Sequence, residues 1–292
     1  MGSPYRLMGI VNVTPDSFSD GGRYLDAGAA IAHGEQLAQE GADILDVGGE
    51  STRPGAEPVS EAQELARVLP VVEGLAAAAT RMASAPQISI DTSKAPVAEA
   101  ALEAGASLVN DVTALRGDPR MVEVIAASGA DCCLMHMLGE PRTMQGAPRY
   151  ADVVEHVKAF LGERLELALA RGVARERIML DPGIGFGKTE AHNLELLRRL
   201  DELLELGAPI LVGTSRKAFL GSILARAGGL EHPPVPAERL AGTLVTNALA
   251  YERGASVFRV HEVAAVRDAL AVTAATLGGR WTARSAGTTP TS

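Results

Sequence analysis

The chain has few aromatic residues, only two cysteines and no strongly basic segment, and each shortage excludes a class of protein. Phe, Tyr and Trp make up 3% of the 292 residues, so the core must be built from aliphatic side chains. Cys132 and Cys133 are neighbours within an apolar run, which disfavours a structural disulfide and favours a reducing compartment. With 27 basic and 36 acidic residues the net charge is −9, which disfavours a nucleic-acid or anionic-membrane surface.

Long hydrophobic runs are also missing. No apolar stretch reaches the roughly 18 residues that a transmembrane helix needs. The first residues, MGSPYRLMGIVNV, lack the apolar segment and the small-residue cleavage site of a signal peptide. We therefore expect a cytoplasmic protein. The composition, 47% hydrophobic and 22% charged, is typical of a globular protein and not of a disordered one.

Short apolar runs alternate with longer segments of helical period along the chain. Strands are expected at 7–13, 44–47, 88–90, 108–112, 132–135, 178–180, 210–212 and 257–260. Helices are expected near 27–40, 60–80, 95–104, 119–128, 152–171, 191–206, 216–227, 237–253 and 262–277. The 3.6-residue period predicts that the helix at 191–206 buries one face made of Leu194, Leu197, Leu200 and Leu204.

This alternation predicts an α/β protein of the (β/α)₈ TIM barrel class. Apolar strands separated by helices are typical of a parallel sheet covered on both faces, and eight units give about 36 residues each. A doubly wound open sheet is the alternative, but the first strand continues into NVTPDSFSDGG, which lacks the GxGxxG turn of that fold. No Pro/Ser-rich linker divides the chain. We expect one domain over 1–280 and a flexible tail over 281–292.

Polar residues follow all eight expected strands, and a barrel brings these ends together on the face where barrel active sites lie. Asp91, Asn110 and Asp181 follow the middle strands, and their acceptor groups suit a ligand with a donor edge, such as an aminopyrimidine ring. Lys217, Arg259 and His261 follow the last two strands, where barrels often bind phosphate; Arg53, after the second strand, is a further candidate. The alternative is that these residues form internal salt bridges at the barrel mouth.

Several long motifs resemble those of the dihydropteroate synthase family. They are GIVNVTPDSFSDGG (9–22), GADILDVGGESTRPGAEPVS (41–60), ISIDTSK (88–94), LVNDVTAL (108–115), LDPGIGFGKT (180–189), GTSRKAFLG (213–221) and FRVHEV (258–263). They run in order from the first expected strand to the last, without large insertions, so the resemblance covers essentially the whole domain.

The resemblance implies a reaction and a set of site residues. The family condenses 6-hydroxymethyl-7,8-dihydropterin diphosphate with 4-aminobenzoate, which releases pyrophosphate and forms 7,8-dihydropteroate for folate synthesis. It does so on a (β/α)₈ barrel, usually as a homodimer, with Mg²⁺ on the diphosphate. By resemblance, the pterin ring would be held by Asp91, Asn110, Asp181 and Lys217. The diphosphate and its metal would lie beside Asn12, Arg259 and His261, with Asn12 as the metal ligand, and Thr52 and Arg53 would close over the site.

The implied chemistry needs positioning and electrostatics more than proton transfer. Departure of pyrophosphate leaves a cation on the exocyclic methylene, which the aniline nitrogen then attacks. We expect the catalytic residues to be Asp91, Lys217, Arg259 and His261. The loops at 14–24 and 48–60 are candidate lids that exclude water, with Asp20 among the binding residues. Met135 and Phe186 are expected either to line the aromatic ligand slots or to fill the barrel mouth.

One position departs from the family pattern. The family usually shows Ser-Arg-Lys-Ser after the seventh strand, whereas this chain has Ser215-Arg216-Lys217-Ala218. The second serine lies at the aminobenzoate carboxylate in the family, so that hydroxyl contact is missing here. The backbone N–H groups at the start of the following helix are the alternative donors.

Two other functions remain compatible with part of this pattern. A pterin-binding methyltransferase barrel would share the pterin half of the site, with Asp91, Asn110 and Asp181. It would have no use for a diphosphate site made of Lys217, Arg259 and His261. A non-catalytic pterin-binding protein would bind pterin without turnover. An assay for pyrophosphate release with both substrates distinguishes all three.

Overall fold

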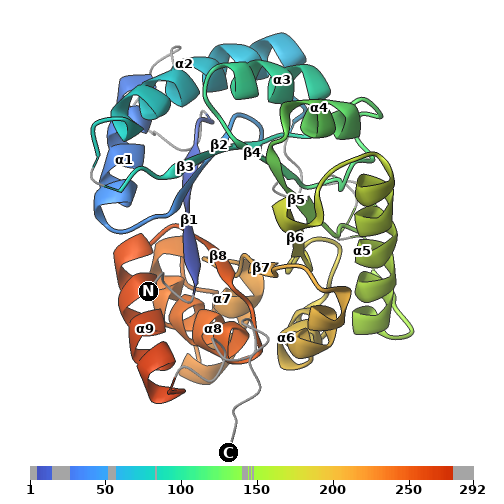
Figure 1. Ribbon diagram of the computed structural model, residues 1–292. Helices are drawn as coiled ribbons and strands as arrows, with labels where there is room; N and C mark the ends of the chain where they lie inside the picture. The colour runs from blue at the N-terminus through green and yellow to red at the C-terminus, as the bar shows by residue number, and fades with distance from the viewer. Residues whose placement is uncertain are drawn as a thin grey trace, which may run out of the picture.

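The computed structural model describes residues 5–14, 27–51, 57–82, 84–139, 144, 146 and 148–278. Its centre is an eight-stranded parallel sheet in the order β6-β5-β4-β3-β2-β1-β8-β7. The strands are β1 (Arg6–Asn12), β2 (Ile44–Gly48), β3 (Gln87–Asp91), β4 (Leu108–Asp111), β5 (Asp131–Met135), β6 (Ile178–Asp181), β7 (Leu211–Val212) and β8 (Val257–Val260). A parallel bridge between Leu180 and Ile210 joins the two ends of the sheet, which closes it into a barrel (Figure 1).

Helices follow the strands and surround the barrel (Figure 1). They are α1 (Ala27–Gln39), α2 (Glu61–Ala79), α3 (Ala95–Glu103), α4 (Met121–Ser128), α5 (Val153–Ala170), α6 (Glu190–Arg198), α7 (Ala218–Gly228), α8 (Leu240–Glu252) and α9 (Val263–Thr276). Short 3₁₀ helices are η1 (Arg175–Arg177), η2 (Leu200–Leu206) and η3 (Pro236–Arg239). The predicted (β/α)₈ barrel is therefore confirmed. Among the described residues, no helix has the length and apolarity needed to cross a bilayer.

The predicted helix at 191–206 is wrong in one respect, because it breaks at Arg199. The α-helix ends at Arg198 and continues as the 3₁₀ helix η2. The Arg199 side chain donates to Asp152 at the start of α5, at 2.9 Å, and to Glu202 at 2.7 Å. This tertiary ion pair accompanies a change of helical phase, so the buried face consists of Leu196, Leu197, Leu200 and Leu203. Leu194, which the period assigned to the buried face, is 41% exposed.

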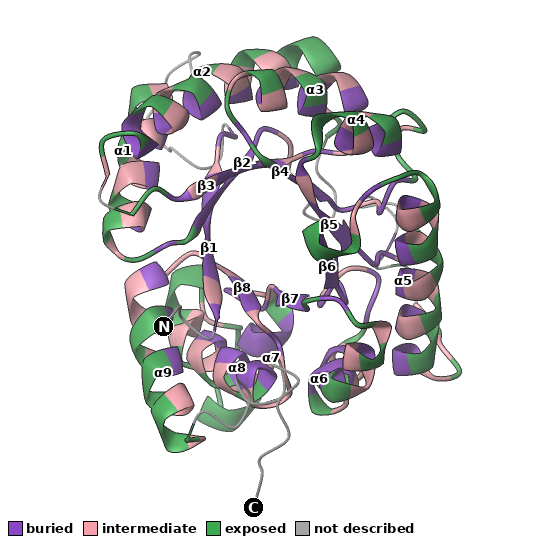
Figure 2. Ribbon diagram, viewed as in Figure 1, coloured by how far each residue is buried: buried purple, intermediate pink, exposed green. Residues whose placement is uncertain are grey.

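Strand alternation sends successive side chains to opposite sides of the barrel wall. Residues such as Leu45, Val47, Ile88 and Ile90 face outward and pack in the main core beneath the helices. Figure 2 shows the consequence, with buried strands and helices that are buried on the inside and exposed outside. The barrel interior holds a separate apolar cluster of Met8, Ile44, Leu108, Cys133, Met179, Leu211 and Val257. The adjacent thiols of Cys132 and Cys133 therefore lie in different cores, and both are free.

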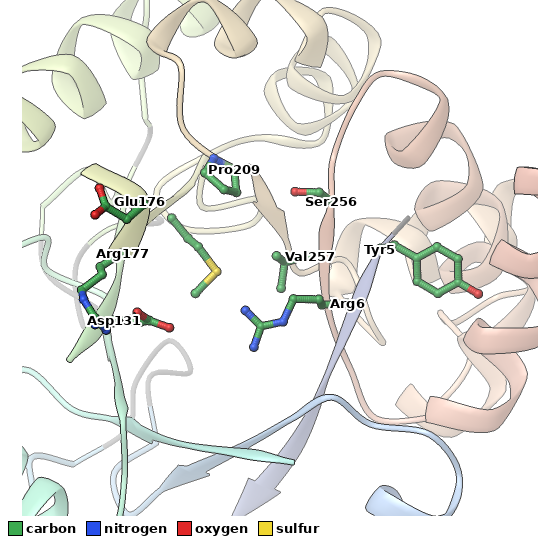
Figure 3. A pocket seen from close by; sticks show the side chains of 9 residues that line it. Tyr5, Arg6, Asp131, Glu176, Arg177, Pro209, Ser256 and Val257 are labelled. Atoms are coloured by element: carbon green, nitrogen blue, oxygen red, sulfur yellow. Dashed lines mark hydrogen bonds and ion pairs between the residues drawn. The ribbon is translucent and has the colours of Figure 1, made fainter. Parts of the chain in front are cut away.

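The amino-terminal end of the barrel is closed by a polar network. Arg6 donates to Gln87 at 2.6 Å, and Gln87 and Arg177 donate to Asp131 at 2.9 and 3.2 Å. A cavity of about 240 Å³ lies among these residues, with Met179 and Val257 on its inner side (Figure 3). In barrels this end serves stability, whereas the opposite end carries the active site.

Candidate active site

The carboxyl ends of the strands carry a polar layer directly above the apolar interior cluster. Two residues along a strand return to the same side, and on four strands an interior apolar residue is followed in this way by an interior polar one. The pairs are Ile44 and Asp46, Leu108 and Asn110, Met179 and Asp181, and Val257 and Arg259. Asp46, Asn110 and Asp181 are buried, with 0%, 4% and 6% of their surface exposed. Carboxylates and amides at this depth must be paired within the protein or with a ligand.

Arg259 links the last strand to the second and third strands. Its Nε donates to Asp46 Oδ2 at 2.7 Å, and a terminal nitrogen donates to Asp91 Oδ2 at 2.8 Å. Asp46 also accepts from Ser89 Oγ at 2.6 Å and from Asn110 Nδ2 at 3.0 Å. Because the amide nitrogen of Asn110 is used in this way, its carbonyl oxygen points away from Asp46 and presents an acceptor.

Burial and the neighbouring charges have opposing effects on the pKa values of Asp91 and Arg259. Burial raises the pKa of Asp91 to about 7, with the Arg259 guanidinium opposing the shift and the Asp46 carboxylate adding to it. Burial alone would lower the pKa of Arg259, but the Asp46 and Asp91 carboxylates raise it. The internal salt bridge expected as an alternative is therefore present for Arg259. The sequence pattern predicted acceptor residues on the middle strands and cations on the last two strands as separate groups. This prediction is wrong for Arg259, because barrel closure brings its guanidinium into contact with the Asp46 and Asp91 carboxylates.

Asp181 and Lys217 form the second half of the polar layer. Asp181 Oδ1 accepts the Gly183 N–H at 2.6 Å, and burial raises the pKa of this carboxyl against the effect of Lys217. Lys217 Nζ donates to the Ile184 carbonyl and lies 4.5 Å from the centroid of the Phe186 ring. Burial lowers the pKa of Lys217 to about 8, with Asp181 opposing and Arg259 adding to the shift. An amine, a carboxylate and an aromatic face thus meet above β6.

Met135 and Phe186 lie together at the barrel mouth. Met135 is 3% exposed and belongs to a cluster with Val112, Met137 and Met144, against which the half-buried Phe186 packs. Phe186 at the same time faces Lys217. Both residues therefore pack together beside the polar layer, and their contact with a ligand stays a prediction.

The turns after β7 and β8 hold each other in place. Ser215 Oγ lies 2.9 Å from His261 Nδ1, and Arg216 donates to Glu262 at 2.5 Å. Arg216 has a left-handed backbone (φ 59°), which is uncommon for a residue other than glycine, and its N–H donates to Thr243 Oγ1 at 3.2 Å. This turn places Lys217 at the N-cap of α7 and leaves Ala218, the first residue of the helix, exposed.

Asn12 is the last residue of β1 and is half-buried; it pairs in register with Gly48 of β2. Its place at the carboxyl end of the barrel agrees with the predicted site. Asp20, Thr52 and Arg53 lie outside the described residues, as do most of the loop at 14–24 and the middle of the loop at 48–60.

Three groups of residues at this end were not predicted as site residues. Asp46 is the first of them, and the sequence does carry a signal for it. A carboxylate inside an apolar strand indicates a polar contact in the barrel interior. Lys188, which is 3% exposed, lies beneath the loop after β6, and its place in a glycine-rich motif gave no indication of burial. Lys94 Nζ contacts Glu50 and also Glu64, the latter at 2.5 Å, at the base of the loop at 48–60.

Comparison with known proteins decides the family. Residues 8–261 match the family described as pterin binding enzyme. A dihydropteroate synthase of Mycobacterium leprae is 47% identical over 277 residues, which cover 94% of each chain. The chain belongs to the dihydropteroate synthase family of pterin binding enzymes. The resemblance and the enzyme class predicted from sequence, a transferase, are confirmed.

Solved structures of dihydropteroate synthases share the fold. The Xanthomonas albilineans dihydropteroate synthase with 4-aminobenzoic acid is 48% identical, with a TM-score of 0.84 and 93% of each chain covered. The same organism's dihydropteroate synthase in complex with 7,8-dihydropteroate is 45% identical, with a TM-score of 0.81 and the same coverage. These matches favour dihydropteroate synthase over the methyltransferase and the non-catalytic binding protein.

Proposed function

We propose that this enzyme condenses 6-hydroxymethyl-7,8-dihydropterin diphosphate with 4-aminobenzoate on the polar layer described above. The observation that carries the proposal is the buried Asp181 carboxylate beside Lys217, Asn110 and Arg259. It offers acceptors and cations in one place, as a substrate with a donor-rich ring and an anionic group requires. The synthases of known structure that share this fold include one with 4-aminobenzoic acid and one with 7,8-dihydropteroate.

The pterin ring binds at Asp181 and Asn110. A pterin presents its 2-amino group and N3–H as adjacent donors, and a carboxylate accepts such a pair through two parallel hydrogen bonds. The Asn110 carbonyl oxygen adds an acceptor, because Asp46 holds the amide nitrogen. Lys217 supplies a donor for the acceptor atoms of the ring. Asp91, held 2.8 Å from Arg259, places negative charge near the ring as it becomes electron-poor.

The reaction breaks one bond and forms another at the exocyclic methylene. The C–O bond to the diphosphate breaks, the electron pair leaves with pyrophosphate, and the pterin ring delocalises the positive charge on carbon. The aniline nitrogen of 4-aminobenzoate then forms the C–N bond and loses one proton to solvent. The protein contributes mainly orientation and charge stabilisation, which provide the largest share of catalysis in such reactions. Arg259 and His261, at the end of β8, stabilise the leaving diphosphate.

We also propose Mg²⁺ as the cofactor, with Asn12 as its protein ligand. Mg²⁺ prefers oxygen ligands, keeps several waters and often binds through substrate phosphates with few protein groups. The donor chemistry fits this mode, because Asn12 offers an amide oxygen at the carboxyl end of β1. When bound, Mg²⁺ supplies positive charge to the diphosphate. Calorimetry of pyrophosphate binding with and without Mg²⁺, in the enzyme and in Asn12→Ala, tests this.

The aminobenzoate carboxylate is assigned to the start of α7. Helix N-termini present free N–H groups and a partial positive charge to anions. This helix begins at Ala218 directly after Lys217, and its first turn carries no acidic residue. The benzoate ring then lies beside Lys217 and Phe186, whose ring faces the ammonium.

A homodimer in a cytoplasmic compartment completes the proposal. Val245 and Leu249, one turn apart on α8, are 58% and 47% exposed, and Leu194 on the neighbouring α6 is 41% exposed. An exposed apolar patch of this kind is typical of a protein interface. Light scattering gives the molar mass of the enzyme and of the double variant Val245→Glu/Leu249→Glu. We expect the mass of a dimer for the enzyme and of a monomer for the variant, and an equal mass for both contradicts this interface. The free thiols of Cys132 and Cys133 support the reducing compartment.

The decisive experiment is an assay for pyrophosphate release with both substrates. We expect stoichiometric pyrophosphate and dihydropteroate. Methyl transfer from a folate without pyrophosphate release would support the methyltransferase, and pterin binding without turnover would support the binding protein.

A further inference from the structure

Lys188 is a buried lysine, 3% exposed, whose side-chain nitrogen is surrounded by acceptors. Its side-chain nitrogen Nζ donates to the carbonyl of Gly183 at 2.9 Å, to the carbonyl of Phe186 at 3.0 Å and to His136 Nδ1 at 2.8 Å. An ammonium has three N–H groups, which match these three acceptors, and the His136 carbonyl oxygen lies farther away, at 3.4 Å. Burial lowers the pKa of Lys188, and the nearby Asp181 carboxylate opposes this shift.

His136, one of the acceptors of Lys188, is itself held in place by the barrel. Burial lowers the pKa of His136 to about 2, with the charge of Lys188 adding to the shift, so the ring is neutral. Its Nδ1 accepts from Lys188, which assigns the ring proton to Nε2. The backbone N–H of His136 donates to the Asp181 carbonyl at 2.9 Å, so the same residue also fixes the end of β6.

The loop at 182–187 is shaped so that its carbonyls reach these donors. Gly183, Gly185 and Gly187 all have positive φ, a backbone conformation that glycine adopts without a steric penalty. A Cβ atom at Gly183 would lie 1.9 Å from the His136 carbonyl oxygen, so only glycine fits this close approach.

This loop carries the contacts of the pterin half of the site. The Gly183 N–H holds Asp181, the Ile184 carbonyl accepts from Lys217, and the Phe186 ring faces the same ammonium. Lys188 binds the carbonyls of Gly183, just before Ile184, and of Phe186, two residues after it. A shift of the loop therefore moves the carboxylate, the ammonium and the aromatic ring together.

We propose that Lys188 is a positioning residue that, through His136 and the carbonyls of Gly183 and Phe186, fixes the loop at 182–187 in the arrangement that binds the pterin ring. The assignment rests on the proposed function of the site. A buried charge is a poor device for stability alone, since an apolar side chain of similar volume often stabilises as well or better. Here it supplies three directed hydrogen bonds that an apolar side chain lacks.

The test compares Lys188→Met with the enzyme and with a matched control, Tyr150→Phe. Methionine keeps the unbranched shape and removes the ammonium. Tyr150 O–H donates to the Gly187 carbonyl at 2.7 Å, so its removal takes one donor from the same loop beyond the pterin contacts. We expect Lys188→Met to raise KM for the dihydropterin diphosphate and Kd for 7,8-dihydropterin at least about tenfold. Both pterin constants in Tyr150→Phe should stay within about twofold.

Several outcomes overturn the proposal. A folded Lys188→Met with unchanged Kd for 7,8-dihydropterin would make Lys188 a stability residue. Equal effects of the two variants on the pterin constants would do the same. If Lys188→Met does not fold, Lys188→Gln, whose amide retains two N–H groups, takes its place, and failure of both to fold overturns the proposal. Calorimetry with 7,8-dihydropterin needs no turnover, so it tests Lys188 even if the native enzyme released no pyrophosphate.

Discussion

Arg259 Nε lies 2.7 Å from Asp46 Oδ2, although the two residues are 213 positions apart in the chain. The contact exists because β8 and β2 are both neighbours of β1 in the barrel. Asp46 is fully buried and also accepts from Ser89 and Asn110. One carboxylate therefore orients both the cation proposed to bind the diphosphate and the amide proposed to bind the pterin.

Asp46→Asn should be strongly destabilising. The amide removes the negative charge and replaces one acceptor oxygen with a donor, which leaves a buried guanidinium underpaired. Removing one partner of a buried ion pair costs about 3–5 kcal/mol of unfolding free energy. Denaturant unfolding measures this. The control is Asp43→Asn, just before the same strand, where the exposed side chain accepts the Leu7 N–H at 2.8 Å and an amide oxygen can replace it. Equal small losses in both variants would show that Asp46 is not a required partner.

The pH profile should report the ammonium of Lys217. The pKa of Lys217 is about 8, so the group loses its charge as the pH rises above that value. We expect kcat/KM for the pterin diphosphate to fall on the alkaline side with a midpoint near 8, since this profile reports the free enzyme. Lys217→Arg keeps the charge to much higher pH, so this limb should move beyond the measured range even if the maximal rate is lower. An unchanged alkaline limb in the variant would assign it to another group.

The sequence predicted the barrel well because the signal is local. Apolar strands, helical period and polar strand ends are properties of short segments, and each expected strand overlaps an observed one. The break at Arg199 was missed because its partner Asp152 lies on another helix, 47 residues away. Helical period alone carries no information about such a contact.

The site was predicted in its residues but not in its pairings. Strand-end residues such as Asn110, Asp181 and Arg259 follow from the pattern, since all strand ends meet on one face. Which cation meets which carboxylate depends on barrel closure and register, and neither is encoded in a short segment. The role of Lys188 was not predicted for the same reason, because its acceptor His136 follows β5, whereas Lys188 itself follows β6.

Ala218→Ser should strengthen aminobenzoate binding. Ala218 is exposed at the first position of α7, so a hydroxyl there has room beside the helix N–H groups assigned to the carboxylate. A hydrogen bond to a charged group such as this carboxylate contributes about 1.5–3 kcal/mol, which corresponds to at least about tenfold in affinity. Steady-state kinetics should show a lower KM for aminobenzoate. KM for the pterin diphosphate is the internal control and should not change; an equal fall in both would indicate a general effect on the site.

Aminobenzoate should bind only after the diphosphate site is filled. Lys217, Arg259 and His261 lie at this end of the barrel, and Arg259 is held by Asp46 and Asp91. We expect bound diphosphate to contribute its own charge and part of the wall of the slot that receives the benzoate ring. Calorimetry should detect no aminobenzoate binding to the enzyme alone and clear binding with pyrophosphate and Mg²⁺. Equal affinity under both conditions would contradict the ordered scheme.

Asp181→Asn separates a ligand carboxylate from a structural one. The amide keeps the size and an acceptor oxygen for the Gly183 N–H, which lies 2.6 Å from Oδ1. It replaces the other oxygen with a donor, so one of the two bonds to the pterin becomes a donor–donor contact. Each bond to a charged group contributes about 1.5–3 kcal/mol, and pterin affinity should fall at least about tenfold to a hundredfold.

The stability of the same variant provides the second measurement. Burial raises the pKa of Asp181, which means that its ionised form is costly in the folded protein. Removing this charge should leave the melting temperature of the ligand-free enzyme nearly unchanged or raise it. A structural salt bridge with Lys217 predicts the reverse, a lower melting temperature with pterin affinity nearly intact. Thermal melts and pterin titrations of both proteins decide between them, and lost stability with unchanged affinity would remove Asp181 from the binding site.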